Sequence, residues 1–419
     1  MRLQAASSSR PAERPLAAAA TLAALVLLVV SWGALHRGFF TRHQIVDTPI
    51  YQRYGAAMDD GRLPYRDFRL EYPPGALPVF ALPALGDVAF DTFRRRFEAQ
   101  MLFLGELTLL SVAVALVALG AGTKRLLGAL AFVALAPLAL GPVVLSRFDL
   151  WPAALATLAL AALVSGRLRL GHLALGAAVA AKLYPAVLVP LALTYVWRRE
   201  GRREALVCGG ILAAAIALVF VPFVVLSPDG VWHSLWQQGS RPLQIESLGA
   251  GLLLAAHQLF DLGLTMRSSH GSQNLAGSGA DALAAVQTVL QIAALAAVWI
   301  LFARGPAGRE RLVQASAAAL VAFVALGKVS SPQFLIWLVP FVPLVAGRRG
   351  LVASALLGAA LVLTQVWFPY RYWDLALHFG ALESWLVLVR DLVLVALLVL
   401  LTVTLRDRDP DRLAARGAA

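Results

Sequence analysis

The chain has a single cysteine and few charged residues for its length. Cys208 is the one cysteine among 419 residues, so no intramolecular disulfide and no cysteine-based metal site can form. Only 14% of the residues are charged, whereas roughly a quarter are charged in soluble globular proteins. This shortage of charge excludes an ordinary soluble chain.

Motifs for nucleotides and metals are also lacking. The sequence has neither a Walker-type phosphate loop nor a His-Glu-x-x-His segment, and its 7 histidines are scattered without metal-ligand spacing. We therefore expect no metal site and no bound cofactor. The net charge of +12 comes mainly from basic residues at the ends of apolar runs, where it indicates membrane topology and not a nucleic-acid partner.

Apolar runs dominate the sequence. Hydrophobic residues make up 59% of the chain, and most runs are near the length of one membrane crossing. We predict an all-α polytopic membrane protein, with residues 1–419 as one integral membrane domain whose first apolar run is an uncleaved helix. The expected crossings lie at about residues 16–35, 99–120, 126–141, 149–165, 204–226, 281–303, 312–327, 331–346, 350–367 and 384–405.

Residues 170–197 need a separate interpretation. This stretch is too long for one helix and is interrupted at Lys182-Leu-Tyr184-Pro185. Basic turns flank it on both sides, so it must cross the membrane an even number of times if both turns lie on one side. We predict a hairpin of two short helices broken at Pro185, which gives about twelve crossings.

Short basic connections set the predicted topology. Together with the two terminal tails they hold 20 of the 36 Lys and Arg residues, and the positive-inside rule places them in the cytoplasm. We therefore expect a plasma-membrane protein with cytoplasmic termini, including the tail at 406–419. These basic segments are 124–125, 167–169, 198–203, 304–311, 348–349 and 406–416.

The opposite, external side then receives two large loops, 36–98 and 227–280. Within them, 76–85 and 248–260 are apolar but too short to span, so we expect interfacial or re-entrant helices. Residues 269–281 are rich in Gly and Ser and predict a flexible external loop.

The first external loop concentrates polar chemistry in an apolar chain. Its tyrosines include Tyr51, Tyr65 and Tyr72. Such a cluster beside the bilayer indicates chemistry or recognition. Within it, Asp59-Asp60-Gly61 favours a turn, and Tyr72-Pro73-Pro74 favours an extended return to the membrane. The five carboxylates of the loop are Asp47, Asp59, Asp60, Asp67 and Glu71.

The short cytoplasmic turns leave no room for a nucleotide-binding domain. An enzyme of this shape would take an activated donor that is carried by a lipid. A carboxylate at the membrane surface can act as general base on a hydroxyl, while a prenyl-phosphate-linked sugar supplies an anionic leaving group that needs cations. Asp47 lies about a dozen residues beyond the first apolar run, close enough to meet such a donor.

A set of short motifs over about residues 40–340 resembles glycosyltransferase family 87, the polyprenyl-phosphate-mannose-dependent mannosyltransferases of the GT-C superfamily and related membrane proteins. The motifs are Asp47-x-x-x-Tyr51, Gly61-x-x-Pro64-Tyr65, Tyr72-Pro73-Pro74, Lys182-x-Tyr184-Pro185 and the segment from Lys328 through Ser331, Gln333 and Trp337 to Pro340.

The resemblance implies a GT-C-like fold and a definite reaction. It places the catalytic base at Asp47, in the first external loop. It further implies direct, inverting transfer of a hexose, mannose in the family, from a polyprenyl phosphate to a lipid or glycan hydroxyl on the outer face of the plasma membrane.

Several residues have two interpretations. Asp47 is a general base or the cap of a helix that starts near Pro49. Tyr51, Glu71 and Tyr72 are candidate substrate contacts, although Glu71 and Tyr72 also fit a role in shaping the loop. Lys182 either reaches the donor phosphate or snorkels toward the membrane surface.

The turn around Lys328 and the segment near Arg371 also have two interpretations each. Lys328, Ser331 and Gln333 fit a phosphate site, or else Ser331 merely caps a helix that begins at Pro332. Arg371 is either a substrate contact or part of an interfacial aromatic belt. The rival class for the whole protein is a polytopic transporter or lipid flippase, which would also show many crossings, a broken helix and an intramembrane lysine.

Overall fold

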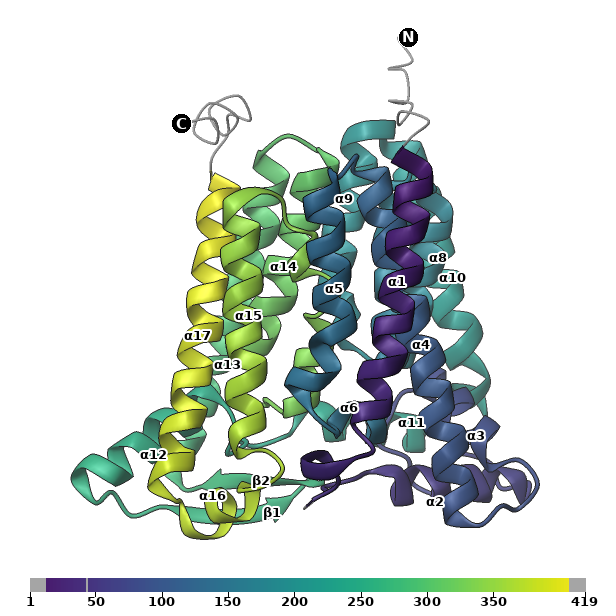
Figure 1. Cartoon of the computed structure of the whole chain (residues 1–419). Coiled ribbons are helices and arrows are strands. Elements are labelled where there is room, and N and C mark those ends of the chain that lie inside the picture. Colours follow the sequence, from purple (N-terminus) through teal and green to yellow (C-terminus); the bar gives the residue numbers. More distant parts are fainter. Residues whose placement is uncertain (1–12, 43, 407–419) are drawn as a thin grey trace.

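Long helices run side by side from one end of the molecule to the other (Figure 1). The computed structural model describes residues 13–42 and 44–406. Nearly all of the predicted cytoplasmic tail at 406–419, and the chain before residue 13, lie outside the described residues. The prediction that both termini are cytoplasmic therefore concerns segments beyond this description.

Among the described residues, seven helices are long and apolar enough to cross a membrane. Their outer faces expose large apolar side chains, such as Leu218, which is 78% exposed; such a surface suits hydrocarbon and not water. The expected helical membrane protein is confirmed at this level. The seven helices are α1 (Glu13–Ala34), α4 (Phe90–Ala118), α5 (Thr123–Leu140), α10 (Arg202–Leu226), α13 (Ser278–Arg304), α15 (Gly347–Trp367) and α17 (Ala381–Arg406).

Shorter helices complete the bundle. α7 (Leu150–Val164) and α14 (Arg309–Ala325) are buried along most of their length. α8 (Leu168–Ala181) and α9 (Val189–Glu200) form the two arms of the predicted hairpin, and the 3-10 turn η3 (Tyr184–Leu188) separates them. The break falls at Lys182 to Pro185, as the sequence indicates. The total of about twelve crossings stays a prediction.

The segment 331–346 differs from the single α-helix expected there. It consists of two 3-10 turns, η4 (Pro332–Trp337) and η5 (Val342–Leu344). Pro340 and Pro343 interrupt the run, and proline cannot donate a backbone hydrogen bond within a helix. The apolar composition suggested a helix, but the prolines decide the local structure.

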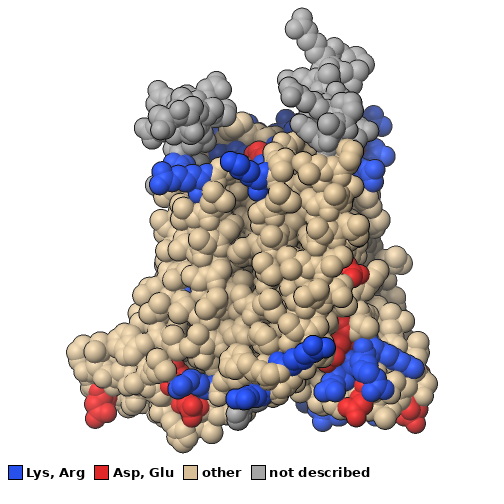
Figure 2. All heavy atoms as spheres, viewed as in Figure 1, with Lys and Arg blue, Asp and Glu red and all other residues tan. Residues whose placement is uncertain are grey.

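The basic turns gather at one end of the molecule, here called the basic end. Arg125 pairs with Glu310 at 2.6 Å, and Arg309 donates to the carbonyl of Ala118 at 3.1 Å. Arg198 similarly donates to the carbonyl of Ala303. Figure 2 shows Lys and Arg in a band there, above a nearly uncharged belt. This distribution is typical of a protein that spans a bilayer.

The opposite end, here called the loop end, is built from short elements. The two apolar stretches expected at the interface are indeed short helices, α3 and α12. The elements at this end are η1 (Gly38–Thr41), α2 (Thr48–Asp59), η2 (Pro74–Ala76), α3 (Leu77–Ala84), α6 (Val143–Ser146), α11 (Pro228–Gly239), α12 (Leu248–Phe260), β1 (Thr265–Ser269), β2 (Ser272–Ala276) and α16 (Tyr372–His378).

The prediction of a flexible loop at 269–281 is wrong. Strands β1 and β2 form an antiparallel hairpin, and its two-residue turn places His270 and Gly271 at positive φ, as a tight hairpin turn requires. The backbone of β2 also bonds to residues Leu243 and Ile245. The small polar residues suggested flexibility, but they are ordered by hydrogen bonds. The side-chain amide of Asn274 donates to oxygen atoms of Ser269 and Ser272.

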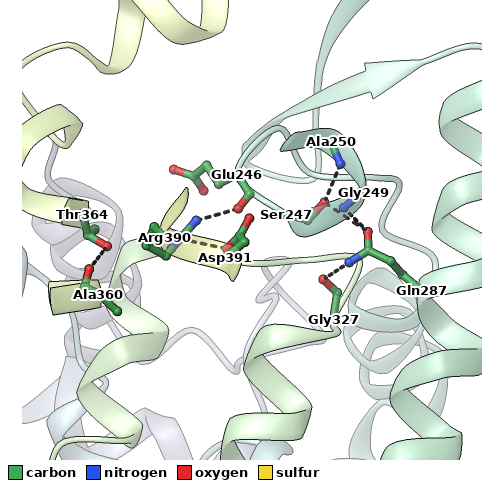
Figure 3. A network of polar contacts seen from close by, with 10 residues as sticks. All are labelled: Glu246, Ser247, Gly249, Ala250, Gln287, Gly327, Ala360, Thr364, Arg390 and Asp391. Carbon is green, nitrogen blue, oxygen red and sulfur yellow. Dashed lines mark hydrogen bonds and ion pairs between the residues drawn. The ribbon is translucent and has the colours of Figure 1, made fainter. Parts of the chain in front are cut away.

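A buried glutamine fastens the second loop to the bundle (Figure 3). The side-chain oxygen of Gln287, on α13, accepts from the backbone N–H of Gly249 at 2.9 Å. Its side-chain nitrogen donates to the carbonyl of Gly327 at 3.2 Å. One amide therefore ties the start of α12 to the end of α14.

We expect Gln287→Ala to destabilise the protein because both backbone groups lose their partner. The cost is about 1–3 kcal/mol for each buried group left unsatisfied. Thermal unfolding of the purified protein in detergent measures the loss. Thr288→Ala is the control, since Thr288 bonds only within its own helix in the contacts described. Equal stability of the two variants would contradict this role.

Candidate active site

Asp47 stands at the start of α2, but its side chain does not cap the helix. Its backbone carbonyl accepts from Ile50 and Tyr51, and no side-chain cap bond forms. The carboxylate instead forms an ion pair with Arg147 and accepts from the hydroxyl of Tyr51 at 3.3 Å. The backbone of Asp47 thus occupies the N-cap position of α2, while its carboxylate contacts Arg147, which is distant in sequence.

An aromatic cluster holds this part of the first loop. The ring of Tyr51 is 1% exposed and stacks on Phe80 with centroids 4.7 Å apart. The ring of Tyr72 meets Phe148 edge-on at 4.8 Å. Burial fixes the Tyr51 hydroxyl beside Asp47. Its contacts therefore indicate a positioning role, whereas the predicted substrate contact would require movement.

The turn Arg147-Phe148-Asp149, between α6 and α7, contributes two buried charges that our sequence reasoning did not select. Asp149 is 1% exposed, and its Oδ1 accepts from Lys182 Nζ at 2.7 Å. The same oxygen accepts from the indole Nε1 of Trp337 at 2.7 Å. One signal was available: two charges in a very short turn between apolar runs, where an ionisable residue marks a functional candidate.

Two of the separate sequence motifs therefore meet at Asp149. Lys182 follows α8 directly and lies over the rings of Phe148 at 4.6 Å and Trp337 at 5.1 Å from their centroids. Tyr184 stacks on Trp337 with centroids 3.9 Å apart. Lys182 is paired and enclosed by aromatic rings, so free snorkelling does not describe it.

Lys328, Ser331 and Gln333 form a second polar group. Lys328 Nζ donates to the carbonyl of Gly239 at 3.2 Å, and the carbonyl of Lys328 accepts from the backbone of Gln244. Ser331 does not cap η4 with its side chain and donates to Gln333 Oε1 at 2.5 Å. Capping by the Ser331 hydroxyl is therefore wrong, and Lys328 links the turn after α14 to the second loop.

Arg371 and Glu71 are engaged by other partners. Arg371 pairs with the buried Glu383 at 3.2 Å, near the start of α17. The backbone carbonyl of Glu71 accepts from Gln238 at 2.8 Å, which joins the first loop to α11. The Glu71 charge acts on Tyr72 and on His270. Glu71 thus lies between the two external loops, and Arg371 is held by its own ion pair.

Glu246 is the second carboxylate in the buried part of the loop end. It is 1% exposed, and its Oε2 accepts from Gln244 Nε2 at 2.5 Å. Its backbone carbonyl accepts from Arg390 (Figure 3). Burial raises the pKa of Glu246 from its ordinary value of 4.5 to about 8, although Arg390 and Arg147 oppose the shift.

We expect stability to fall as the pH rises from about 4.5 to about 8 through Glu246. In this range the folded protein keeps a proton that the unfolded chain releases, so the free energy of unfolding decreases by up to about 1.4 kcal/mol per pH unit. Thermal unfolding at several pH values, for the parent and for Glu246→Gln, isolates the effect. The variant should show the flatter profile, and parallel profiles would contradict this assignment.

Arg147 is a buried cation that interacts electrostatically with both Asp149 and Glu246. Burial lowers the pKa of Arg147 to about 10, while the charges of Asp149 and Glu246 act in the opposite direction. It therefore remains a cation at neutral pH. Arg241 also lies within electrostatic range of Lys182 and Glu246. The site combines a partly exposed carboxylate, Asp47, with the buried cation Arg147 and with the neighbouring Asp149–Lys182 pair, so it offers fixed positive charge to an anion.

A small apolar cavity of about 40 Å³ lies next to the charged turn. Leu28 and Trp32 of α1 line one side, and Val144 and Leu150 flank the turn itself. The remaining walls come from α4, α5 and the η4 segment. Among the described residues, no group of three or more His, Cys, Asp and Glu side chains could hold a metal ion.

The structure brings some of the motif residues together and leaves others apart. Lys182 and Trp337, from two of the motifs, meet at one oxygen of Asp149, and Asp47 lies beside the neighbouring Arg147. Arg371 makes its ion pair with Glu383. In comparison with known proteins, no family model and no curated protein matches this chain.

Proposed function

We propose that the protein is a GT-C-like membrane glycosyltransferase. It moves a hexose, mannose by the family resemblance, from a polyprenyl phosphate to a hydroxyl of a lipid or glycan acceptor. In this proposal the basic end faces the cytoplasm and the loop end faces outward at the plasma membrane. The observation that carries it is the ion pair between Asp47 and the buried Arg147, two positions before Asp149 of the Asp149–Lys182 pair.

Asp47 is the general base in the proposed reaction. Its carboxylate takes the proton of the acceptor hydroxyl, and the hydroxyl oxygen attacks the anomeric carbon of the donor. The bond between that carbon and the phosphate oxygen breaks, and the polyprenyl phosphate leaves as an anion. Attack opposite the leaving group inverts the anomeric configuration. Asp47 suits this role because its side chain is 23% exposed, whereas that of Arg147 is 8% exposed.

Cations supply the second part of the mechanism. A phosphate leaving group is stabilised by fixed positive charge in a site of low dielectric constant. Arg147 is the first candidate because it already pairs with a carboxylate, and an arginine fork binds carboxylate and phosphate alike. Donor binding would draw Arg147 from Asp47 to the phosphate and free the base. Lys182 stabilises the arrangement through Asp149, and Lys328 is a second proposed phosphate contact, from the turn after α14.

The small apolar cavity beside Val144 offers an apolar contact to the head of the donor's lipid chain, which is too large to enter it whole. It adjoins the charged turn and is lined mainly by hydrocarbon side chains. A polyprenyl chain would place its phosphate toward the polar turn and its tail toward the bilayer. This arrangement supports a lipid-borne donor over a soluble one.

The transporter or flippase alternative has one supporting observation. The buried Asp149–Lys182 pair lies where the α8–α9 hairpin is broken, and broken helices with charged groups also occur in transporters. In that case the lipid-linked substrate would cross the membrane with its sugar still attached.

Reconstitution into vesicles separates the two functions. The purified protein is given a polyprenyl-phosphate hexose labelled in the sugar, with a cell-envelope lipid extract as acceptor. The proposal predicts labelled product together with stoichiometric release of polyprenyl phosphate, and no transfer from a nucleotide sugar. Movement of intact donor between leaflets without product would support the alternative and contradict glycosyl transfer.

A further inference from the structure

A second cavity lies at the basic end, far from the loop-end chemistry. It measures about 290 Å³ and lies between α5 and α15. Both helices begin at this end of the molecule (Figure 1). The residues that shape it include Lys124, Arg125, Gly128, Phe132, Gly350 and Ser354.

The upper part of this cavity is positively charged. Lys124 is exposed in the first turn of α5. The side chain of Arg125 is only 19% exposed; it pairs with Glu310 and donates to the carbonyl of Leu344. Its Nε atom is buried and has no hydrogen-bond partner among the described residues. Gly347 and Gly350, in the first turn of α15, line the same space.

The lower part is apolar and continues onto the membrane-facing surface. Phe132 and Leu351 line the cavity. Leu351 is 72% exposed, and Leu127 on α5 is 47% exposed, so both helices that form the cavity expose apolar side chains. The cavity is therefore cationic at Lys124 and Arg125 and mainly apolar along Phe132 and Leu351.

We propose that this cavity binds the phosphate head group of an anionic phospholipid from the leaflet at the basic end. The head group lies beside Lys124, Arg125 and the start of α15, and one acyl chain lies along Phe132 and Leu351. Basic recesses between membrane helices bind anionic lipid head groups in this way. The apolar lower wall favours a lipid over a free phosphate. This site is independent of the proposed glycosyl transfer.

Binding should stabilise the basic end. Arg125 already joins α5 to α14 through Glu310 and to η5 through Leu344, and a bound phosphate would add a link to the first turn of α15. A ligand that binds only the folded protein raises its melting temperature.

The test is thermal unfolding of the full-length protein in detergent with added short-chain lipid. We expect phosphatidylglycerol to raise Tm by about 2–6 °C at saturating concentration, and phosphatidylcholine or inorganic phosphate to leave Tm nearly unchanged. An equal rise with phosphatidylcholine would overturn the proposal. A rise with inorganic phosphate alone would replace the lipid with a soluble anion and would also overturn it.

Two variants address the cavity itself. A side chain at Gly128 would meet no atom within 4 Å at its Cβ, so Gly128→Leu should fold, fill the space and abolish the lipid-dependent shift. Gly210→Leu on α10, where a Cβ also meets nothing, is the control and should keep the full shift. Lys124→Gln should lose at least half of the shift, with Arg202→Gln as its control. Cavity variants that respond like the parent would refute the site.

Discussion

Asp47→Asn is expected to lower glycosyl transfer by about 10²–10⁴-fold, the usual contribution of a general base. Asparagine keeps the size of the side chain and its contact with Tyr51 but cannot accept the acceptor's proton. The Asp47 carboxylate is held beside Arg147, where asparagine can still accept a hydrogen bond. Initial rates at saturating donor and acceptor measure the effect.

Controls separate catalysis from folding at this position. Asp60→Asn changes a carboxylate in the same loop that pairs only loosely with Arg62, at 3.9 Å, and should retain activity. Asp47→Glu keeps a carboxylate and should recover part of the lost rate. The Asp47 variants should also retain a cooperative unfolding transition, since the side chain is partly exposed. Full activity in a folded Asp47→Asn protein would remove Asp47 from the mechanism.

Asp149→Ala is expected to destabilise the protein by about 3–5 kcal/mol, the cost of leaving a buried charge without its partner. The carboxylate is 1% exposed and accepts from both Lys182 and Trp337. Its removal leaves the ammonium of Lys182 and the indole N–H without their acceptor. Unfolding in detergent, monitored by Tm and by denaturant midpoint, measures the loss.

A double-mutant cycle tests whether the pair acts as a unit. Lys182→Met fits among Phe148, Phe334 and Trp337, which surround the lysine nitrogen. Combined with Asp149→Ala it removes both charges, so the double variant should be more stable than Asp149→Ala alone. Additive destabilisation would show that the two side chains do not depend on one another.

The membrane architecture was predictable because it depends on local composition. Uncharged runs marked the long helices, and Pro185 marked the break between α8 and α9. Predictions from local composition were wrong at two segments, where proline or strand pairing determines the backbone conformation. Prolines turned 331–346 into 3-10 turns, and pairing with residues near Leu243 ordered the hairpin at 265–276.

The candidate site was only partly predictable because its contacts join distant segments. Asp47 and Lys182 were selected from their own surroundings. Their partners, Arg147 and Asp149, are separated by Phe148 alone but lie about a hundred residues from Asp47 in sequence. The pairing of these charged side chains depends on how α6 and α7 pack against the first loop. A single sequence can therefore indicate candidate site residues, but it cannot show which of them form ion pairs.

The most direct test of glycosyl transfer follows the anomeric carbon itself. A polyprenyl-phosphate hexose labelled with ¹³C at this carbon is incubated with the purified protein and its acceptor, and the NMR signal is recorded over time. The proposal predicts loss of the donor signal and matched growth of a product signal of the opposite anomeric configuration. A product of retained configuration, or a donor signal that persists while the lipid is merely moved across the membrane, would contradict it.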